Sequence, residues 1–267
     1  MASNSAPDLN AVVTAREDLN EALIVIRAEF EDGDQPSFVP GQFTNLGLPA
    51  SGEEGGANGF VKRPYSVASA PSEKGVEFFI RLVEDGALTP KLWKLGAGDR
   101  LWMDKRFLGK FTLEHLPESP AQADRDLVMV STGTGLAPFV SMLREFRAAR
   151  PWRRFVMING VRIESDLGYR QELESLDRET DWFTYLPICS RVDADGPWRG
   201  LRGRVGEALD PALYSDLVGV PLDTDHSQVF LCGNPDMIDT VQADLEGRGF
   251  QRHKRKDPGQ LHLERYW

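Results

Sequence analysis

The tetrapeptide Arg-Pro-Tyr-Ser at residues 63–66 combines three side chains that could hold a flavin. Arg63 offers a rigid guanidinium fork for a diphosphate, and Tyr65 offers a flat ring that could lie on an isoalloxazine. Ser66 adds a small hydroxyl that could bond the flavin near its reactive nitrogen. An ordinary strand that follows a turn could carry the same residues, so this motif alone leaves both interpretations open.

A second motif, Gly-Thr-Gly-Leu-Ala-Pro, lies farther along the chain at residues 133–138. Gly133 and Gly135 let a backbone turn come close to a phosphate-bearing ligand. A single Gly-x-Gly could also be a plain tight turn, and its place between a strand and a helix is the context that a phosphate site requires. The order and separation of the two motifs together indicate a flavin that faces a nicotinamide nucleotide.

The composition is typical of a soluble globular protein, with 41% hydrophobic and 27% charged residues. A chain of 267 residues is long for one domain and comfortable for two. No apolar run approaches the ~20 residues that a membrane helix needs, so no membrane association is expected. The first residues contain no basic segment followed by an apolar one, so we expect no secretion signal and a cytoplasmic location.

The net charge of −10 argues against a nucleic-acid partner, because phosphate binding needs a basic surface. Basic residues nevertheless gather at 141–154 and at 248–256. These stretches could steer an acidic protein partner, or they could be ordinary solvated helix faces.

The two cysteines, Cys189 and Cys232, are too few for a disulfide scaffold or for an iron–sulfur cluster, which takes four protein ligands. The four histidines show no ligand spacing, and no metal is expected. We expect Cys189 to be structural.

The first half of the chain is predicted to be rich in β-structure. Short runs of alternating apolar residues are separated by Gly and Pro turns, and strands at this spacing suggest a barrel. Thr89 could cap a short helix over 89–95, with Pro90 at its first position. The predicted strands cover 22–28, 42–46, 65–68, 76–82 and 100–103.

After a polar linker at 117–126, near-continuous apolar runs alternate with helical patterns. Such an order indicates a parallel sheet with crossover connections, in which ligands bind at the carboxyl ends of the strands. Asn234 is the expected N-cap of the last helix, and Gly247 should follow its end. The expected strands cover 127–130, 155–158, 182–187 and 229–231, the helices 139–149, 167–176 and 235–246, and the polar loops 131–138, 189–193 and 232–236.

Two further motifs join the two described above. With all four, the chain resembles the bacterial ferredoxin–NADP reductases, also called flavodoxin reductases. The matching motifs are 63–66, 133–138, Cys-Gly-Asn-Pro at 232–235 and the terminal Glu-Arg-Tyr-Trp at 264–267. They span nearly the whole chain, and the aromatic terminus is the most specific of them.

The resemblance implies two domains and one activity. An N-terminal antiparallel β-barrel at 1–118 would bind FAD, and an α/β parallel-sheet domain at 119–267 would bind NADP and return its aromatic tail to the flavin. The family exchanges electrons between NADPH, which gives a hydride, and ferredoxin or flavodoxin, which takes one electron at a time. The implied partners are therefore acidic electron carriers, and nothing requires more than a monomer.

By the same resemblance, Tyr65, Ser66 and Cys232 would take part in catalysis, with Cys232 beside the nicotinamide. Backbone amides and a hydroxyl of residues 87–89 would face the diphosphate. The rings of Tyr266 and Trp267 would cover the flavin and adenine rings. The implied FAD residues are Arg63, Pro64, Tyr65, Ser66, Phe79, Ile80, Arg81, Leu82, Ala87, Leu88, Thr89, Thr134, Tyr266 and Trp267.

Arginines that follow successive strands resemble the family's clamp on the adenosine 2′-phosphate. An arginine cluster suits that phosphate, whereas NAD recognition prefers a carboxylate on the ribose. Asp193 and Asp195, close behind Arg191, depart from this pattern, and the loop at 51–59 has no assigned role. The implied NADP residues are Gly133, Gly135, Arg162, Ser190, Arg191, Arg204, Cys232, Gly233 and Asn234.

Two other functions remain open at this point. An NAD(P)H-dependent flavin reductase component that serves an oxygenase or another acceptor would have similar domains, although such chains often carry an iron–sulfur module that the cysteine count excludes. A flavin-binding regulatory module without turnover is the second alternative. Comparing turnover with NADPH and with NADH tests the first alternative. Mixing the protein with NADPH tests the second, because a module without turnover would leave the flavin oxidised.

Overall fold

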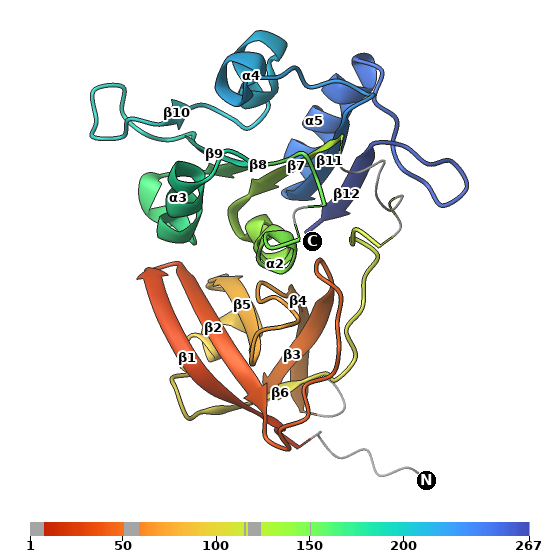
Figure 1. Cartoon of the computed structure of the whole chain (residues 1–267). Coiled ribbons are helices and arrows are strands. Elements are labelled where there is room, and N and C mark those ends of the chain that lie inside the picture. Colours follow the sequence, from red (N-terminus) through yellow and green to blue (C-terminus); the bar gives the residue numbers. More distant parts are fainter. Residues whose placement is uncertain (1–7, 51–58, 115, 117–123, 150, 267) are drawn as a thin grey trace. The chain divides into compact units, whose positions relative to one another are not determined.

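The chain divides into two compact units, and each is described by itself below (Figure 1). The first unit comprises Met1–Leu113 and Val140–Glu145, and the second comprises Glu114–Phe139 and Phe146–Trp267. The predicted domain boundary and most of the predicted linker at 117–126 lie outside the described residues. The structure, a computed structural model, describes residues 8–50, 59–114, 116, 124–149 and 151–266.

The first unit contains a six-stranded antiparallel sheet in the order β4-β3-β6-β1-β2-β5 (Figure 1). Alternate residues of these strands enclose one apolar core, in which Ile24, Ile26, Phe78 and Leu101 are buried. The predicted antiparallel, barrel-like fold is therefore confirmed. The strands are β1 (Ala11–Asn20), β2 (Leu23–Phe30), β3 (Phe43–Pro49), β4 (Phe60–Ser66), β5 (Val76–Arg81) and β6 (Arg100–Met103).

Three features of this unit differ from the prediction. The strand expected at 65–68 is β4, which instead begins at Phe60 and ends at Ser66. Strand β1 was not predicted, because its second half is charged and largely exposed and so lacks an apolar alternation. The short helix α1 spans only Thr89–Leu92, and its N-cap is Leu88 rather than Thr89. The expectation that Thr89 caps this helix is wrong, because its hydroxyl bonds to the backbone of Val83 instead.

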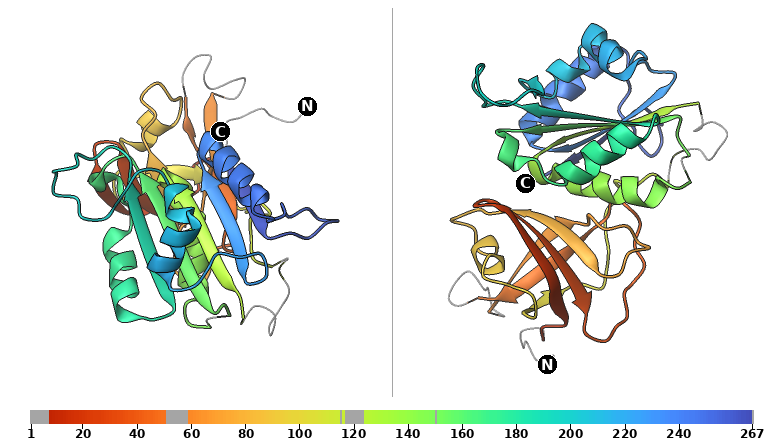
Figure 2. Two further views of the ribbon diagram at one scale, coloured as in Figure 1. Left: turned by 90° about the horizontal axis from the view of Figure 1, so that it is seen from above. Right: turned by 60° about the vertical axis from the view of Figure 1, so that its left-hand side comes forward.

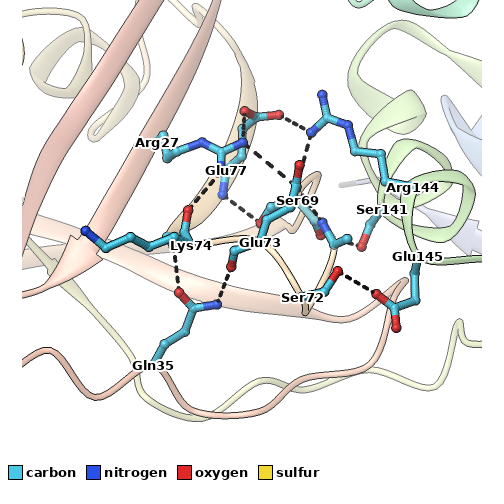
Figure 3. Close-up of polar contacts among 12 residues, drawn as sticks. Arg27, Gln35, Ser69, Ser72, Glu73, Lys74, Glu77, Ser141, Arg144 and Glu145 are labelled. Atoms are coloured by element: carbon cyan, nitrogen blue, oxygen red, sulfur yellow. Dashed lines mark hydrogen bonds and ion pairs between the residues drawn. The ribbon is translucent and has the colours of Figure 1, made fainter.

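Residues 140–145 of helix α2 (Ala137–Phe146) belong to the first unit and make polar contacts with it (Figure 3). One carboxylate oxygen of Glu77 lies 2.8 Å from Arg27 Nη2, and the other lies 2.8 Å from Arg144 Nη1. Burial alone would raise the pKa of Glu77, but the two arginines hold that pKa below its usual range. The carboxylate therefore stays ionised between two cations.

Two further contacts hold the same segment. Ser141 donates to the carbonyl of Ser69 at 2.7 Å, and the Ser69 hydroxyl accepts from the amide of Glu77 at 3.0 Å (Figure 3). A Cβ added at Gly41, whose φ is +97°, would lie 1.9 Å from the backbone carbonyl oxygen of Phe111 and 2.7 Å from the end of the Met142 side chain. Close approach and backbone conformation thus both require glycine at this position.

The second unit contains a six-stranded parallel sheet in the order β10-β9-β8-β7-β11-β12 (Figure 1). The central strands are almost fully buried, as expected for a sheet that is covered on both faces. The predicted α/β parallel-sheet fold is confirmed. The strands are β7 (Asp126–Thr132), β8 (Arg154–Val161), β9 (Phe183–Cys189), β10 (Leu201–Arg202), β11 (Ser227–Gly233) and β12 (Leu261–Arg265).

Helix α3 lies on one face of this sheet, and helices α4 and α5 lie on the other (Figure 2). The N-cap prediction for α5 is confirmed, because Asn234 Oδ1 accepts from the amides of Asp236 at 2.8 Å and Met237 at 3.2 Å. The 3₁₀ turns are η2 (Gly133–Leu136), η3 (Glu164–Asp166) and η4 (Glu207–Leu209), and the helices are α3 (Arg170–Glu179), α4 (Pro211–Val218) and α5 (Pro235–Gly247).

Several predicted boundaries of this unit are wrong by a few residues. α2 begins at Ala137 because η2 runs directly into it, and α3 begins at Arg170 because Tyr169 is left-handed, with φ of 56°. α5 includes Gly247, and the glycine with positive φ is Gly249. Strands β10 and β12 at the sheet edges and helix α4 were not predicted.

Within the described part of the chain, no helix is long and apolar enough to cross a membrane. The same residues include no group of three or more His, Cys, Asp or Glu side chains that could hold a metal ion.

Candidate functional site

The Arg-Pro-Tyr-Ser motif forms the end of β4, where Arg63 lies opposite Leu46 and Ser66 lies opposite Phe43 on β3. Arg63 is exposed, and its guanidinium donates to the backbone carbonyl of Lys62 at 2.8 Å. Among the residues that the structure describes, it makes no ion pair with a carboxylate. Its remaining donors are therefore available to an anion.

The other two side chains of the motif are more enclosed. The half-buried ring of Tyr65 meets the ring of Phe78 edge-on, with centroids 6.5 Å apart. Burial raises the pKa of Tyr65 above its usual range, so its hydroxyl stays neutral. Ser66 is 9% exposed, and its hydroxyl makes no hydrogen bond to another described residue.

The loop that follows β5 is closed by Thr89. Its hydroxyl accepts from the amide of Val83 at 3.0 Å and donates to the carbonyl of Val83 at 2.9 Å. Because both hydrogen-bonding directions are used, the backbone amides of Ala87 and Leu88 are better placed to meet an anion than this hydroxyl. The neighbouring Phe79 and Ile80 on β5 are buried, whereas Arg81, Leu82 and Ala87 are partly exposed.

In the second unit, the turn after β7 lies against the end of β11. A Cβ added at Gly135 would lie 2.4 Å from the carbonyl oxygen of Cys232, so only glycine allows this approach. Gly133 has φ of +53°, and Gly233 has φ of +131°. The hydroxyl of Thr132 accepts from the amide of Asn234 at 3.0 Å and joins the two loops. Both predicted loops therefore meet at the carboxyl edge of the sheet, and Thr134 in the first of them is partly exposed.

The end of β11 also meets the end of the chain. Cys232 pairs with Glu264 on β12, and its Sγ lies 3.9 Å from Glu264 Oε2. The amide of Tyr266 donates to the carbonyl of Gly233 at 3.0 Å, and its hydroxyl lies beside the Cys232 thiol. Trp267 lies outside the described residues.

Burial sets the protonation of this group. It raises the pKa of the Cys232 thiol well above its usual range, and the Glu264 carboxylate adds to this rise. Burial also raises the pKa of Glu264 to about 7, and the contact with Cys232 opposes that rise only in part. Cys232 is therefore a thiol at neutral pH, and Glu264 takes up its proton at a pH well above that of an ordinary carboxyl.

The three arginines predicted to clamp a phosphate follow neighbouring strands of the sheet. The amide of Arg191, after β9, donates to the carbonyl of Arg162, after β8, at 2.7 Å. Arg204 follows β10, and the amide of Gly203 donates to the carbonyl of Cys189 at the end of β9 at 3.0 Å. All three arginines are exposed.

We call Arg162, Arg191 and Arg204 the exposed arginine set. None of them forms an ion pair with a carboxylate in the described ranges of the chain. The hydroxyl of Ser190 donates to the carbonyl of Val161 at 3.2 Å, so Ser190 lies at the same edge of the sheet. Asp193 and Asp195 are exposed, and neither pairs with Arg191.

Comparison with known proteins assigns the chain to a family. Residues 129–243 match the model of the oxidoreductase NAD-binding domain. A flavodoxin/ferredoxin–NADP reductase from Buchnera aphidicola subsp. Baizongia pistaciae is 33% identical over 232 residues, or 86% of this chain and 88% of that protein. The chain belongs to this reductase family. The flavodoxin/ferredoxin–NADP reductase of Escherichia coli K12 is also similar, with 32% identity over 232 residues and the same coverage.

A solved member of the reductase family has the same fold. The ferredoxin NADP⁺ reductase from Neisseria gonorrhoeae, solved with bound FAD and NADP, is 27% identical to this chain with a TM-score of 0.84. The alignment covers 97% of this chain and 98% of that protein. The resemblance inferred from the four motifs is thereby confirmed.

Within this reductase fold, Glu264 is a candidate site residue that sequence analysis missed. It was quoted as part of the terminal motif, but only the aromatic residues after it were given roles. Its pairing with Cys232 across two strands brings an ionisable group next to a predicted site residue. No signal in the sequence could have revealed it, because β12 is a strand only through its pairing with β11.

The geometry fits the two ligands that the family implies. An exposed arginine without a carboxylate partner, a half-buried aromatic ring and an unengaged buried hydroxyl occur together on β4, as a flavin with a diphosphate would need. Gly135 and Gly233 let the turn after β7 pack closely on the end of β11, at the carboxyl edge of the parallel sheet where such folds bind a dinucleotide. The residue roles themselves are proposals.

Proposed function

We propose that this chain is an FAD-dependent oxidoreductase that exchanges electrons between NADPH and ferredoxin or flavodoxin. The observation that carries the proposal is the exposed arginine set, which has no carboxylate partner among the described residues. Such a set suits a 2′-phosphate, whereas an NAD site would place a carboxylate at the ribose. The names of the relatives and the FAD and NADP bound to the solved reductase support it.

FAD, when bound, accepts a hydride and releases its electrons one at a time. On the first unit, Arg63 would bind the diphosphate through its free guanidinium donors, with the amides of Ala87 and Leu88 beside it. The neutral Tyr65 would offer its ring, and the Ser66 hydroxyl would donate to or accept from the flavin. The other proposed FAD residues are Pro64, Phe79, Ile80, Arg81, Leu82, Thr89, Thr134, Tyr266 and Trp267.

On the second unit, the carboxyl edge of the sheet would bind the nucleotide. Gly133, Gly135 and Gly233 would let its phosphates and nicotinamide approach the backbone, with Asn234 next to them. Cys232 would offer a compact uncharged thiol. Ser190 would join the exposed arginine set at the adenosine end.

Glu264 would hold a proton near this thiol. With a pKa of about 7, its carboxyl exchanges a proton readily at neutral pH, and Tyr266 encloses the same group from the other side. The enclosed position would exclude water from the thiol. A proton held at Glu264 would keep this group neutral, and its release would leave a carboxylate there.

Small acidic electron carriers are the proposed partners. The exposed side chains of Arg252, Lys254, Arg255 and Lys256 support this, because basic groups on an acidic protein can steer an acidic one. The proposed domains are residues 1–118 for FAD and 119–267 for NADP. A monomer and a cytoplasmic location remain predictions.

The test is a reconstitution followed by an assay. Purified protein saturated with FAD should be yellow, and NADPH should then drive reduction of an artificial one-electron dye and of ferredoxin or flavodoxin. A colourless protein that does not take up FAD would contradict the proposal. Equal turnover with NADH and NADPH would instead favour a reductase component for another acceptor.

A further inference from the structure

The loop between β9 and β10 carries Arg191 but has little structure of its own. Residues 190–200 contain no helix or strand, and they are exposed or partly exposed with one exception. That exception is Trp198, whose side chain is 4% exposed. Arg202 Nη2 also donates to the carbonyls of Ala194 and Trp198, and Val192 packs on the same apolar cluster, so Trp198 is the buried anchor of a loop with several supports.

Packing and hydrogen bonds hold the anchor in place. The Trp198 ring lies in a small apolar cluster with Val161, Leu167 and Cys189. Its Nε1 donates to the carbonyl of Leu201 at 2.8 Å. A Cβ added at Gly200 would lie 2.3 Å from the ring, so the chain turns tightly around the indole. The ring thus connects the loop to the end of β8 and to β10.

A cation covers the same ring. The guanidinium carbon of Arg170 lies 5.4 Å from the Trp198 ring centroid, within the range of a cation–π contact. Arg170 is held there by Glu164 and by Glu174, the latter at 2.6 Å from Nε. Arg170 therefore ties the segment after β8, which begins with Arg162, to the loop that carries Arg191.

The three members of the exposed arginine set are close in sequence to the residues of this contact. Arg162 precedes Glu164, and Arg191 and Arg204 lie on either side of Trp198. Their backbones are fixed nearby, with the Arg191 amide 2.7 Å from the Arg162 carbonyl and the Arg204 amide 2.9 Å from Glu207 Oε1. Three long side chains bind one phosphate well only if their backbones are held in register.

We propose that Trp198 and Arg170 are positioning residues that determine selectivity for the adenosine 2′-phosphate. This inference rests on the proposed function, because it assigns what holds the exposed arginine set in its binding arrangement. Neither residue is assigned a contact with the nucleotide. Loss of the Trp198–Arg170 contact would remove one of the contacts that hold the loop at 190–200 against the segment after β8, and with it part of what fixes Arg191 relative to Arg162.

The experiment measures binding of two small probes to the FAD-saturated protein by calorimetry. Adenosine 2′,5′-bisphosphate carries the 2′-phosphate, and adenosine 5′-monophosphate lacks it. The variants are Trp198→Leu and Arg170→Leu, with Trp198→Phe as the conservative replacement. Matched controls are Trp182→Leu at the other end of β9 and Arg178→Leu at the other end of α3.

We expect Trp198→Leu and Arg170→Leu to weaken bisphosphate binding about tenfold, while monophosphate binding changes less than about twofold. Trp198→Phe should recover part of the loss, and the two controls should bind both probes like the wild type. The ratio of kcat/KM for NADPH to that for NADH should fall with the bisphosphate affinity. Near-ultraviolet circular dichroism identifies any variant that fails to fold, and in that case Trp198→Phe and Arg170→Leu carry the comparison.

The outcomes separate this inference from the proposed function. A wild type that binds both probes equally overturns the proposed NADPH preference and the inference with it. A wild type that prefers the bisphosphate, with variants that keep the same preference, overturns the inference alone. Equal weakening of both probes also overturns it, because that pattern indicates a general loss of structure.

Discussion

In the first unit, Arg27 and Arg144 meet opposite oxygens of Glu77 at 2.8 Å each (Figure 3), and the three side chains are 25%, 13% and 10% exposed. In the second unit, the exposed arginine set meets no carboxylate in the described part of the chain. The same residue type therefore occurs in two states within one protein. In one its charge is neutralised inside the fold, and in the other it faces solvent.

The paired arginines of the first unit should therefore affect stability, and the exposed arginine set should affect binding. A charge pair that is largely buried is costly to break, because removing one partner leaves the other desolvated and alone. An exposed arginine contributes little to stability, and the N–H donors of its guanidinium group remain available to a phosphate. Substitutions in the first group should therefore change unfolding, and substitutions in the second should change nucleotide affinity.

The largest expected effect comes from breaking the paired group. Glu77→Ala removes the carboxylate closest to Arg27 and Arg144 and leaves them the more distant Glu73, at 3.8 Å and 3.5 Å, so it should lower the free energy of unfolding by about 3 kcal/mol. Denaturant unfolding of the FAD-saturated protein measures this change. Glu29→Ala is the matched control, since its ion pair with the exposed Lys74 should contribute less than about 1 kcal/mol. Similar losses for both variants would contradict the distinction.

Arg191→Ala should show the reverse behaviour. It should weaken NADPH binding by about 2 kcal/mol, leave NADH binding nearly unchanged, and change the free energy of unfolding by less than about 0.5 kcal/mol. Steady-state kinetics with both nucleotides and a denaturation curve measure the two quantities. Equal losses with NADPH and NADH would count against the assignment of the 2′-phosphate.

Glu264 differs from both groups, because it is a partly buried carboxyl that contacts a thiol instead of an arginine. Its pKa is about 7 in the folded protein and 4.5 when unperturbed, so the folded state binds the proton more tightly. The contribution of Glu264 to stability is therefore greatest below pH 4.5 and is lost as the pH rises to 7.

Glu264→Gln removes this dependence. Between pH 5 and pH 8 the wild type should lose roughly 1.5 kcal/mol of stability relative to the variant, a value reduced for partial exposure of the carboxyl. Unfolding curves for both proteins at a series of pH values provide the measurement. Parallel pH profiles would show that the carboxyl titrates as it does in water.

The smallest expected effect concerns the acids behind Arg191. Asp193→Asn removes an exposed negative charge two residues from a proposed phosphate ligand, and it should strengthen NADPH binding by about 0.5 kcal/mol at low salt. Asp181→Asn at the other end of β9 is the control and should have no effect. The gain should disappear at high salt, and a gain that persists would point to a change in loop structure.

The sequence predicted the fold class because both halves have strong local patterns. The apolar runs of β7, β8, β9 and β11 are nearly continuous, and glycine, proline and asparagine mark the ends of the elements around them. Strand β12 has a mixed pattern, Leu-His-Leu-Glu-Arg, and becomes a strand only because β11 lies beside it. Such edge strands depend on tertiary pairing, which no local pattern reveals.

The site was predictable where one motif contains all of its parts. Arg63, Tyr65 and Ser66 are adjacent, and so are Gly133 and Gly135. The group of Cys232 with Glu264 joins residues 32 positions apart, and the contact of Arg144 with Glu77 joins residues 67 positions apart. Only the paired strands and the packed helix bring these side chains together, so neither group could be inferred from residue types alone.

The most direct test of the central claim is anaerobic rapid mixing of the yellow, FAD-saturated protein with NADPH or NADH at the same limiting concentration. The account predicts that NADPH bleaches the visible flavin band at least about tenfold faster than NADH, because the exposed arginine set binds the 2′-phosphate. A flavin band that NADPH leaves unchanged, or that both nucleotides bleach at the same rate, would contradict it.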